Sequence, residues 1–252
     1  MNIMISRSGI RGAFPRRRLV SSLIVALSAA VLFLAGCGGG KGSIAGKEPV
    51  KNVIKVGNNA QALGAWTELK AKASVLVHID PADDLTVFAQ ANAEDMANAA
   101  AHLERHNVEV VTRIAPLLEN GGTVNLGYMA GMYERVIWVV PSRQSVGEAS
   151  VDTYRNFFLA HRNFPATAVT GFRKEGANIV GTVASVPLTI TRFADLSIGE
   201  NETAIIDLDI AYFPAMKLED RSYRTGMKSL LNFLRELGAK GIRTNLVTVN
   251  LS

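Results

Sequence analysis

Two stretches of the chain place closely spaced aspartates directly after an apolar run. Residues 74–85 read SVLVHIDPADDL, and residues 203–214 read TAIIDLDIAYFP. Near-continuous apolar runs of this length favour parallel strands buried on both faces. The proline in each stretch ends the strand, because proline has no N–H to donate. Ligands bind at the carboxyl ends of strands in open α/β sheets, so at least four acids converge there if the two strands are neighbours.

These acids are Asp80, Asp84, Asp207 and Asp209. Their position after two strands favours a binding or catalytic site, since such sites gather ionisable groups at one edge of a sheet. The alternative is that the same aspartates cap helices and solvate the loops that follow each strand. The residues alone leave both interpretations open.

The histidines are weaker candidates for the same chemistry. His78 lies inside the first apolar run, so we interpret it as a hydrogen-bonded core residue. His102 and His106 are four residues apart and could share a metal on one helical face. They also fall in the predicted last turn of a helix, where the dipole favours histidine, and no third ligand is apparent. We therefore favour the structural interpretation for this pair.

The first 36 residues are typical of a secretory signal. They carry five arginines and no lysine or acid, and they include a 16-residue apolar run from Leu19 to Leu34. A membrane span needs about 20 apolar residues, which disfavours the alternative of an uncleaved anchor. The ending Leu34-Ala35-Gly36-Cys37 resembles the lipobox of bacterial lipoproteins, in which the cysteine is lipidated and becomes the new N-terminus. Cys37 is the one cysteine of the chain.

This resemblance divides the chain into three parts. They are a signal peptide (1–36), the lipidated Cys37 with a flexible tether rich in Gly, Lys and Ser (37–51), and a folded domain (52–252). It implies a protein of the cell envelope whose partner is a membrane, contacted through the lipid. Because Gly38 rather than an aspartate follows the cysteine, the resemblance further implies the outer membrane in a host that has one.

Removal of the signal changes the charge of the protein. The whole chain has 27 Lys+Arg and 22 Asp+Glu, a formal charge of +5. Without the five arginines of the signal, 22 basic residues face 22 acidic ones, so the exported part is about neutral. A nucleic-acid partner has no electrostatic support in such a domain. With Cys37 used for lipid, the domain contains no disulfide, and about 200 residues suffice for a stable core.

Strand and helix patterns alternate along the domain. Strands are predicted from 53, 74, 136, 203 and 246, helices at 61–72, 92–106, 128–134, 151–160 and 222–237, and a hairpin at 168–183. This alternation predicts a single α/β domain with three layers, α/β/α, and a mostly parallel sheet.

The aspartate stretches carry a resemblance to a known superfamily. VHIDPADDL is similar to the Asp-x-His-x-Asp strand end of arginase and deacetylase-like proteins, and IIDLDIAYF is similar to their Asp-x-Asp strand end. NAQALGAW at 59–66 resembles the opening His-Asn-x-Ala-Leu motif of uncharacterised proteins distantly related to arginases. VNLGYMAGMYERVIWVVP resembles another segment of that family. The likeness runs from about Val53 to Ser252 and implies an arginase/deacetylase-like fold with ancestral metal-dependent hydrolysis of C–N bonds.

The chain departs from that pattern at both histidines. Ala82 stands where the family has a histidine between two aspartates, and Asn59, or Asn58 in the neighbouring register, stands at the position of the opening histidine. The resemblance implies a metal site reduced to four carboxylates, those of Asp80, Asp84, Asp207 and Asp209. Such an all-oxygen site suits Mn²⁺, Mg²⁺ or Ca²⁺ better than Zn²⁺. The implied hydrolysis is therefore weakened or lost, and the alternative is a non-catalytic envelope protein that keeps the fold for binding or scaffolding.

The lipobox generates the first prediction. Cys37→Ser should abolish lipid labelling and leave the protein as its uncleaved precursor, because no other cysteine can take the lipid. Metabolic labelling with a radioactive fatty acid, followed by electrophoresis of the precursor and mature forms, measures both effects. Unchanged labelling of the variant would contradict the assignment of Cys37.

Overall fold

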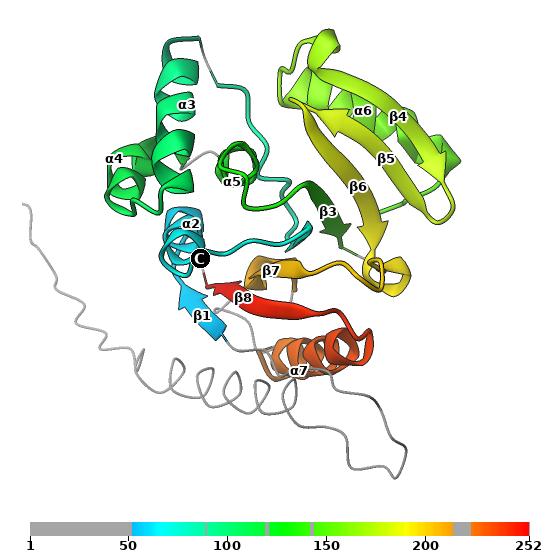
Figure 1. Ribbon diagram of the computed structural model, residues 1–252. Helices are drawn as coiled ribbons and strands as arrows, with labels where there is room; N and C mark the ends of the chain where they lie inside the picture. The colour runs from blue at the N-terminus through cyan, green and yellow to red at the C-terminus, as the bar shows by residue number, and fades with distance from the viewer. Residues whose placement is uncertain (1–51, 89, 119–120, 142–143, 214–222, 252) are drawn as a thin grey trace, which may run out of the picture.

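The computed structural model describes residues 52–88, 90–118, 121–141, 144–213 and 223–251 (Figure 1). The predicted signal peptide (1–36), Cys37 and the tether (37–51) lie outside these residues, so the lipid anchor stays a prediction. Within the described part of the chain, no helix combines the length and apolar character that crossing a membrane requires.

The described strands form one eight-stranded sheet in the order β1-β8-β7-β2-β3-β6-β5-β4. The strands from β1 to β6 across the sheet run parallel, and β5 and β4 add antiparallel pairs at one side. Their bounds are β1 (Asn52–Val56), β2 (Val75–Ile79), β3 (Arg135–Val140), β4 (Val169–Glu175), β5 (Asn178–Val183), β6 (Val186–Arg192), β7 (Ala204–Asp209) and β8 (Thr244–Asn250). The predicted α/β class with a mostly parallel sheet is therefore confirmed.

Helices cover the central strands on both faces. One face carries α2 (Asn59–Glu68), α3 (Gln90–Glu104), α4 (Glu109–Leu118), α5 (Thr123–Met129) and α6 (Val151–Asn156), whose buried side chains share a core cluster with Leu76 and Trp138. The other face carries α7 (Tyr223–Ala239), where Phe233 and Leu234 join Val77 in a second cluster. Because β2 meets a core on each side, all five of its residues are buried, as its apolar run predicts.

All five predicted helices differ from their predicted ranges, and α4 was not predicted. Helix α6 ends at Asn156 instead of residue 160, and α7, predicted at 222–237, spans Tyr223–Ala239. Helix α5 occupies Thr123–Met129 rather than 128–134, because Gly121 and Gly122 turn the chain directly into it with φ of 96° and 98°. Helix α3 begins at Gln90, so Asn92 lies inside the helix and is not its cap. Helix α2 ends at Glu68 instead of continuing to residue 72, and Lys70 follows with φ of 50°.

The position of β2 in the sheet determines where a ligand could bind. Its neighbours are β7 and β3. The chain continues from β2 to β3 on one side, whereas β7, β8 and β1 lie on the other. In open α/β sheets, ligands bind at the carboxyl ends of the strands at such a point. The register pairs His78 with Asp207 and Ile79 with Leu208. Asp80 and Asp209 end their strands at the same corner.

Gly127 of α5 has no room for a side chain, and this gives the second prediction. A Cβ added at Gly127 would lie 2.6 Å from the hydroxyl oxygen of Tyr133. Tyr133 is buried, and its hydroxyl donates to the Val124 carbonyl at 2.7 Å, so the ring has little room to withdraw. We expect Gly127→Ala to lower the free energy of unfolding by about 1–3 kcal/mol in urea denaturation.

The matched control is Gly64→Ala in α2. There the nearest atom to an added Cβ is Val111 Cγ1, at 4.0 Å. Replacing an interior helical glycine by alanine without a clash should stabilise the protein by about 0.5–1 kcal/mol. Effects of the same sign in both variants would contradict this account of the packing around α5.

Candidate metal centre

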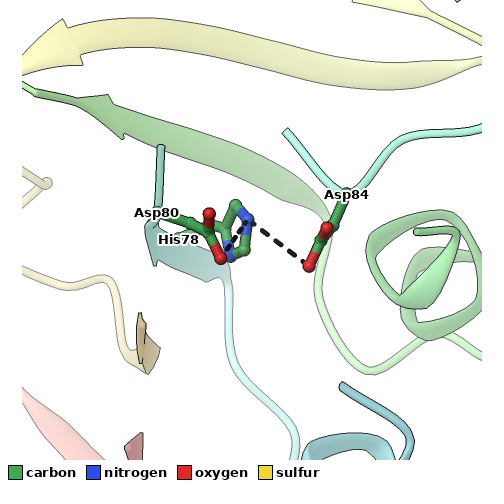
Figure 2. A group of neighbouring side chains, drawn as sticks. All are labelled: His78, Asp80 and Asp84. Atoms are coloured by element: carbon green, nitrogen blue, oxygen red, sulfur yellow. Dashed lines mark ion pairs between the residues drawn. The ribbon is translucent and has the colours of Figure 1, made fainter. Parts of the chain in front are cut away.

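Three side chains that can bind a metal meet at the carboxyl end of β2, where they point toward one another (Figure 2). His78 Nε2 lies 3.9 Å from Asp80 Oδ2 and 3.9 Å from Asp84 Oδ2. The candidate ligand atoms of the three residues all lie within 4.8 Å of one another, and all three residues are buried. Metal–ligand bonds of about 2.0–2.6 Å span such separations, so this group could hold one ion.

Two tight turns in the loop after β2 bring Asp84 back to the end of the strand. Asp80 Oδ1 accepts the backbone N–H of Ala82 at 2.6 Å, and Asp83 Oδ1 accepts that of Leu85 at 2.8 Å. Aspartate side chains that bond two residues onward mimic a backbone turn. Asp84 itself has φ of 48°, a left-handed conformation that aspartate adopts more readily than most residues. Local sequence thus bends the loop toward the site.

A chain of hydrogen bonds behind His78 determines which ring nitrogen carries the proton of the neutral imidazole. The indole N–H of Trp66, which can only donate, reaches Thr248 Oγ1 at 3.2 Å. Thr248 then donates its hydroxyl to Asp207 Oδ1 at 2.6 Å. His78 Nδ1 donates to the other oxygen of Asp207 at 3.1 Å, because an ionised carboxylate only accepts. A carboxylate behind the imidazole is the usual support of a histidine ligand in metal sites.

The second ring nitrogen, His78 Nε2, is buried and has no hydrogen-bond partner among the described residues. The nearest carboxylate oxygens, on Asp80 and Asp84, lie 3.9 Å away, which is beyond hydrogen-bond reach. Leaving such an atom unsatisfied costs about 1–3 kcal/mol. In the ion-free protein the ring is protonated and Nε2 carries a hydrogen toward the two acids. A cation that displaced this proton would meet the lone pair of Nε2 between two carboxylates.

Asp209 and Asn59 lie at the same corner without joining the three-residue group. Asp209 Oδ1 accepts the backbone N–H of Ala211 at 2.6 Å and caps a short 3₁₀ turn. Asn59 Nδ2 donates to Asp84 Oδ2 at 2.5 Å, and Asn59 Oδ1 accepts from Asn250 at 2.9 Å. Asn59 therefore orients Asp84, while Asp209 adds negative charge to the corner and shapes the backbone after β7.

Burial and the nearby charges shift the ionisation of these groups. Burial raises the pKa of Asp80 to about 7, with attraction to His78 opposing the shift and repulsion from Asp84 adding to it. Burial likewise raises the pKa of Asp84 to about 6, against His78 and with Asp207 and Asp209 adding to the shift. Burial lowers the pKa of His78, but the hydrogen bond to Asp207 and the neighbouring acids outweigh it, and the pKa rises to about 10. Without an ion, an imidazolium therefore balances part of the acidic charge.

The structure places the two aspartate strands side by side, which is the condition on which the sequence argument depends. The group of side chains that it brings together differs from the predicted set of four carboxylates. His78 belongs to this group, which therefore offers a nitrogen beside its carboxylate oxygens, and the set of four carboxylates stays a prediction. His78 is buried and hydrogen-bonded to Asp207, as expected of a core residue, and it also faces Asp80 and Asp84. Asp207 lies behind the imidazole. The signal that was available is the His-x-Asp spacing of His78 and Asp80, since alternate residues of a strand point to the same side.

The remaining sequence candidates have other positions. Ala82 meets the centre through its backbone N–H. His102 lies in the last turn of α3, whereas His106 lies beyond the end of that helix with φ of 62°. The two histidines therefore do not share a helical face.

Comparisons with protein-family models, with curated proteins and with solved structures give no match to this chain. The chemistry of the centre is therefore inferred from its own geometry. Its main elements are a supported imidazole, two converging carboxylates and an amide that orients one of them.

The charges at this corner predict that the ion-free protein loses stability as the pH rises. The pKa of Asp80 is about 7 in the folded protein against an ordinary 3.8, so the folded state binds more protons in that window and stability falls across it. Asp84 also makes stability fall as the pH rises, up to its raised pKa of about 6. The protonated His78 stabilises the folded state fully below pH 6.5, its ordinary pKa, and this stabilisation is lost as the pH rises through the raised pKa of about 10. Chelator-treated protein should melt at a higher temperature near pH 5 than near pH 8.

Asp80→Asn is the matching variant, because an amide does not titrate in this range. It should reduce the difference in melting temperature between the two pH values. A melting temperature of chelated wild type that climbs from pH 5 to pH 8 would contradict the charge balance described above.

Proposed function

We propose that the protein is an exported lipoprotein of the cell envelope whose domain binds one divalent cation at His78, Asp80 and Asp84 and slowly hydrolyses a C–N bond. The observation that carries the proposal is the buried, unpartnered Nε2 of His78, which lies between two carboxylates. Three protein ligands leave coordination positions for water or substrate, as in catalytic rather than structural metal sites.

The residues of the centre have separate roles in this proposal. A bound divalent cation would supply Lewis-acid activation of water and of the scissile group. Asp207 accepts a hydrogen bond from the Nδ1–H of His78, which leaves Nε2 directed toward Asp80 and Asp84. Thr248 and Trp66 hold Asp207 from behind. Asn59 restrains Asp84 by donating to the oxygen that also faces His78.

The arginase/deacetylase-like form of the fold is part of the same proposal. The motifs that resemble that superfamily lie at the ends of β2 and β7, and Asn59, from the opening motif, contacts Asp84 at the same corner. The clustering of three separate motif segments supports a common origin of the site, because nothing in their sequence separation requires them to meet.

Mn²⁺ is the ion that we propose first. Mg²⁺ and Ca²⁺ are bound through oxygen in most protein sites, whereas an imidazole nitrogen among the ligands favours a transition metal. Mn²⁺ accepts both carboxylate and imidazole. Mg²⁺ and Ca²⁺ remain comparison ions because two of the three ligands are carboxylates. Zn²⁺ is a third comparison ion, because the reason to disfavour it was an all-oxygen site and this group contains an imidazole.

A second candidate function is ligand binding or scaffolding without turnover. The observation that favours it is that Asn59 and Ala82 stand where the family that the chain resembles has histidines, so neither position supplies an imidazole. Asn59 is also occupied as a donor to Asp84. In this alternative the imidazolium of His78 balances the acids and the corner is a structural charge cluster.

Thermal melts with and without a chelator distinguish the two functions. A bound ion stabilises the folded state by about 2.7 kcal/mol at a hundredfold excess over Kd. We expect Mn²⁺ to raise the melting temperature of the purified full-length chain and a chelator to lower it. Asp80→Asn removes a ligand charge, so its melting temperature should be lower than that of the Mn²⁺-loaded wild type and should barely respond to either addition.

Asp95→Asn is the matched control, because Asp95 is exposed on α3. It should keep the full response to Mn²⁺ and chelator. If Asp80→Asn is instead more stable than wild type and neither responds to chelator, the acids converge but hold no ion, and the metal-dependent function is wrong.

Activity assays give a separate prediction. With Mn²⁺ present, hydrolysis of arginine, agmatine and acetylated amines should remain far below the roughly 10 per second of ordinary enzymes, because Ala82 and Asn59 supply no imidazole. Ala82→His with Asn59→His should increase Mn²⁺ affinity in calorimetry. Turnover near the ordinary rate would contradict the one-ion account, and a bound ion with no hydrolysis of any C–N substrate would favour the binding function.

A further inference from the structure

An ion pair outside the metal group holds the loop that carries two of its ligands. Arg162 donates through Nε at 3.0 Å and through Nη2 at 2.8 Å, both to Asp83 Oδ2. The Asp83 side chain is 0% exposed and that of Arg162 is 26% exposed. Asp83 Oδ1 accepts the N–H of Leu85, so both oxygens of this buried acid are engaged. Asp83 is thus turned away from the metal group and toward Arg162.

The backbone around Arg162 has an uncommon geometry. Helix α6 continues as a π-helical segment, Phe157–His161, and the N–H of Arg162 reaches back to the carbonyl of Phe157 at 3.2 Å. The guanidinium carbon lies 5.7 Å from the centre of the Phe157 ring. Single π turns insert one residue into a helix and are frequent at functional sites. Here the wider turn directs Arg162 toward the loop after β2.

The loop is held at three points on different elements. Asn59 of α2 binds the side chain of Asp84, and the N–H of Gly122 donates to the backbone oxygen of Asp84 at 2.9 Å. Arg162 holds the preceding residue. Between these points Asp84 keeps its left-handed φ of 48°, a conformation that persists only when its surroundings impose it.

We propose that Arg162 is a positioning residue of the metal centre. By fixing Asp83, it holds the loop so that the neighbouring Asp84 presents its carboxylate to His78 Nε2. The inference rests on the proposed function, because it assigns Arg162 an effect on ion affinity. A buried ion pair is weak evidence for stability alone, since a well-packed apolar pair often serves equally well, whereas two N–H donors on one oxygen fix the direction of a side chain.

Ion affinity and stability must be measured separately, because removing Arg162 also leaves a buried acid unpaired. The variants are Arg162→Met, Arg162→Lys, and Asp83→Asn combined with Arg162→Met, each in the full-length chain. Asp83→Asn removes the unpaired buried charge and keeps an oxygen that accepts the N–H of Leu85. Without ions, the double variant should therefore melt at the temperature of ion-free wild type. The matched control is Arg173→Met, which removes an exposed arginine that pairs with Glu175 on β4.

Calorimetric titration with Mn²⁺ gives the deciding readout. Loss of a residue that hydrogen-bonds a metal ligand typically lowers metal affinity by about 10–100-fold. Arg162 acts one residue further away, through Asp83, so we expect a loss of about 10-fold in Arg162→Met and in the double variant. Arg162→Lys should recover part of the affinity, because lysine keeps the charge but offers only one point of contact. Arg173→Met should bind as wild type does.

Two outcomes would overturn the inference while leaving the metal centre intact. The first is an Mn²⁺ affinity of Arg162→Met equal to that of wild type. The second is a double variant in which the Mn²⁺ affinity and the melting temperature both return to wild-type values, because the ion pair would then serve stability alone. Failure of the wild type itself to bind Mn²⁺ would overturn the proposed function and, with it, the role of Arg162.

Discussion

The burial of several acids around one imidazole is the constraint on which the centre depends. Asp80, Asp84, Asp207 and His78 are all buried, and a buried charge is costly unless it is paired. Asp207 is paired, with Thr248 on one oxygen and His78 on the other. The remaining two acids face a nitrogen that is too far away for a hydrogen bond. A cation at that point would resolve the unfavourable charges and the unpartnered nitrogen together.

The sheet and the two hydrophobic cores that cover it hold part of this arrangement in place. Parallel pairing of β2 with β7 sets His78 beside Asp207, and the two cores on either side keep the strands buried and fixed. The loop after β2 then completes the group, because its aspartates bond their own backbone and bend it back. Rigid strands thus hold the imidazole and its support, while a restrained loop delivers Asp84.

Strong local patterns made much of this predictable. The apolar runs before Asp80 and Asp207 identified two central strands. That these strands are neighbours was only a condition of the argument, because the sequence does not determine the order of strands in the sheet. The convergence of His78 with Asp80 and Asp84 was not predicted, because the apolar neighbours of His78 in sequence resemble a core and its unpartnered nitrogen depends on residues distant in sequence. Trp66 and Thr248, which fix the proton of the ring, are 182 residues apart. The double glycine before α5 likewise shifted that helix in a way that periodicity did not reveal.

The most direct test of the account is a crystal structure of the protein grown with Mn²⁺, with anomalous diffraction collected on the manganese edge. We expect one anomalous peak among His78 Nε2, Asp80 Oδ2 and Asp84 Oδ2, at metal–ligand distances of about 2.0–2.6 Å. His78 Nδ1 should remain bonded to Asp207. An anomalous map with no peak at this corner, and a water molecule bridging His78 Nε2 to the two carboxylates, would contradict the central claim.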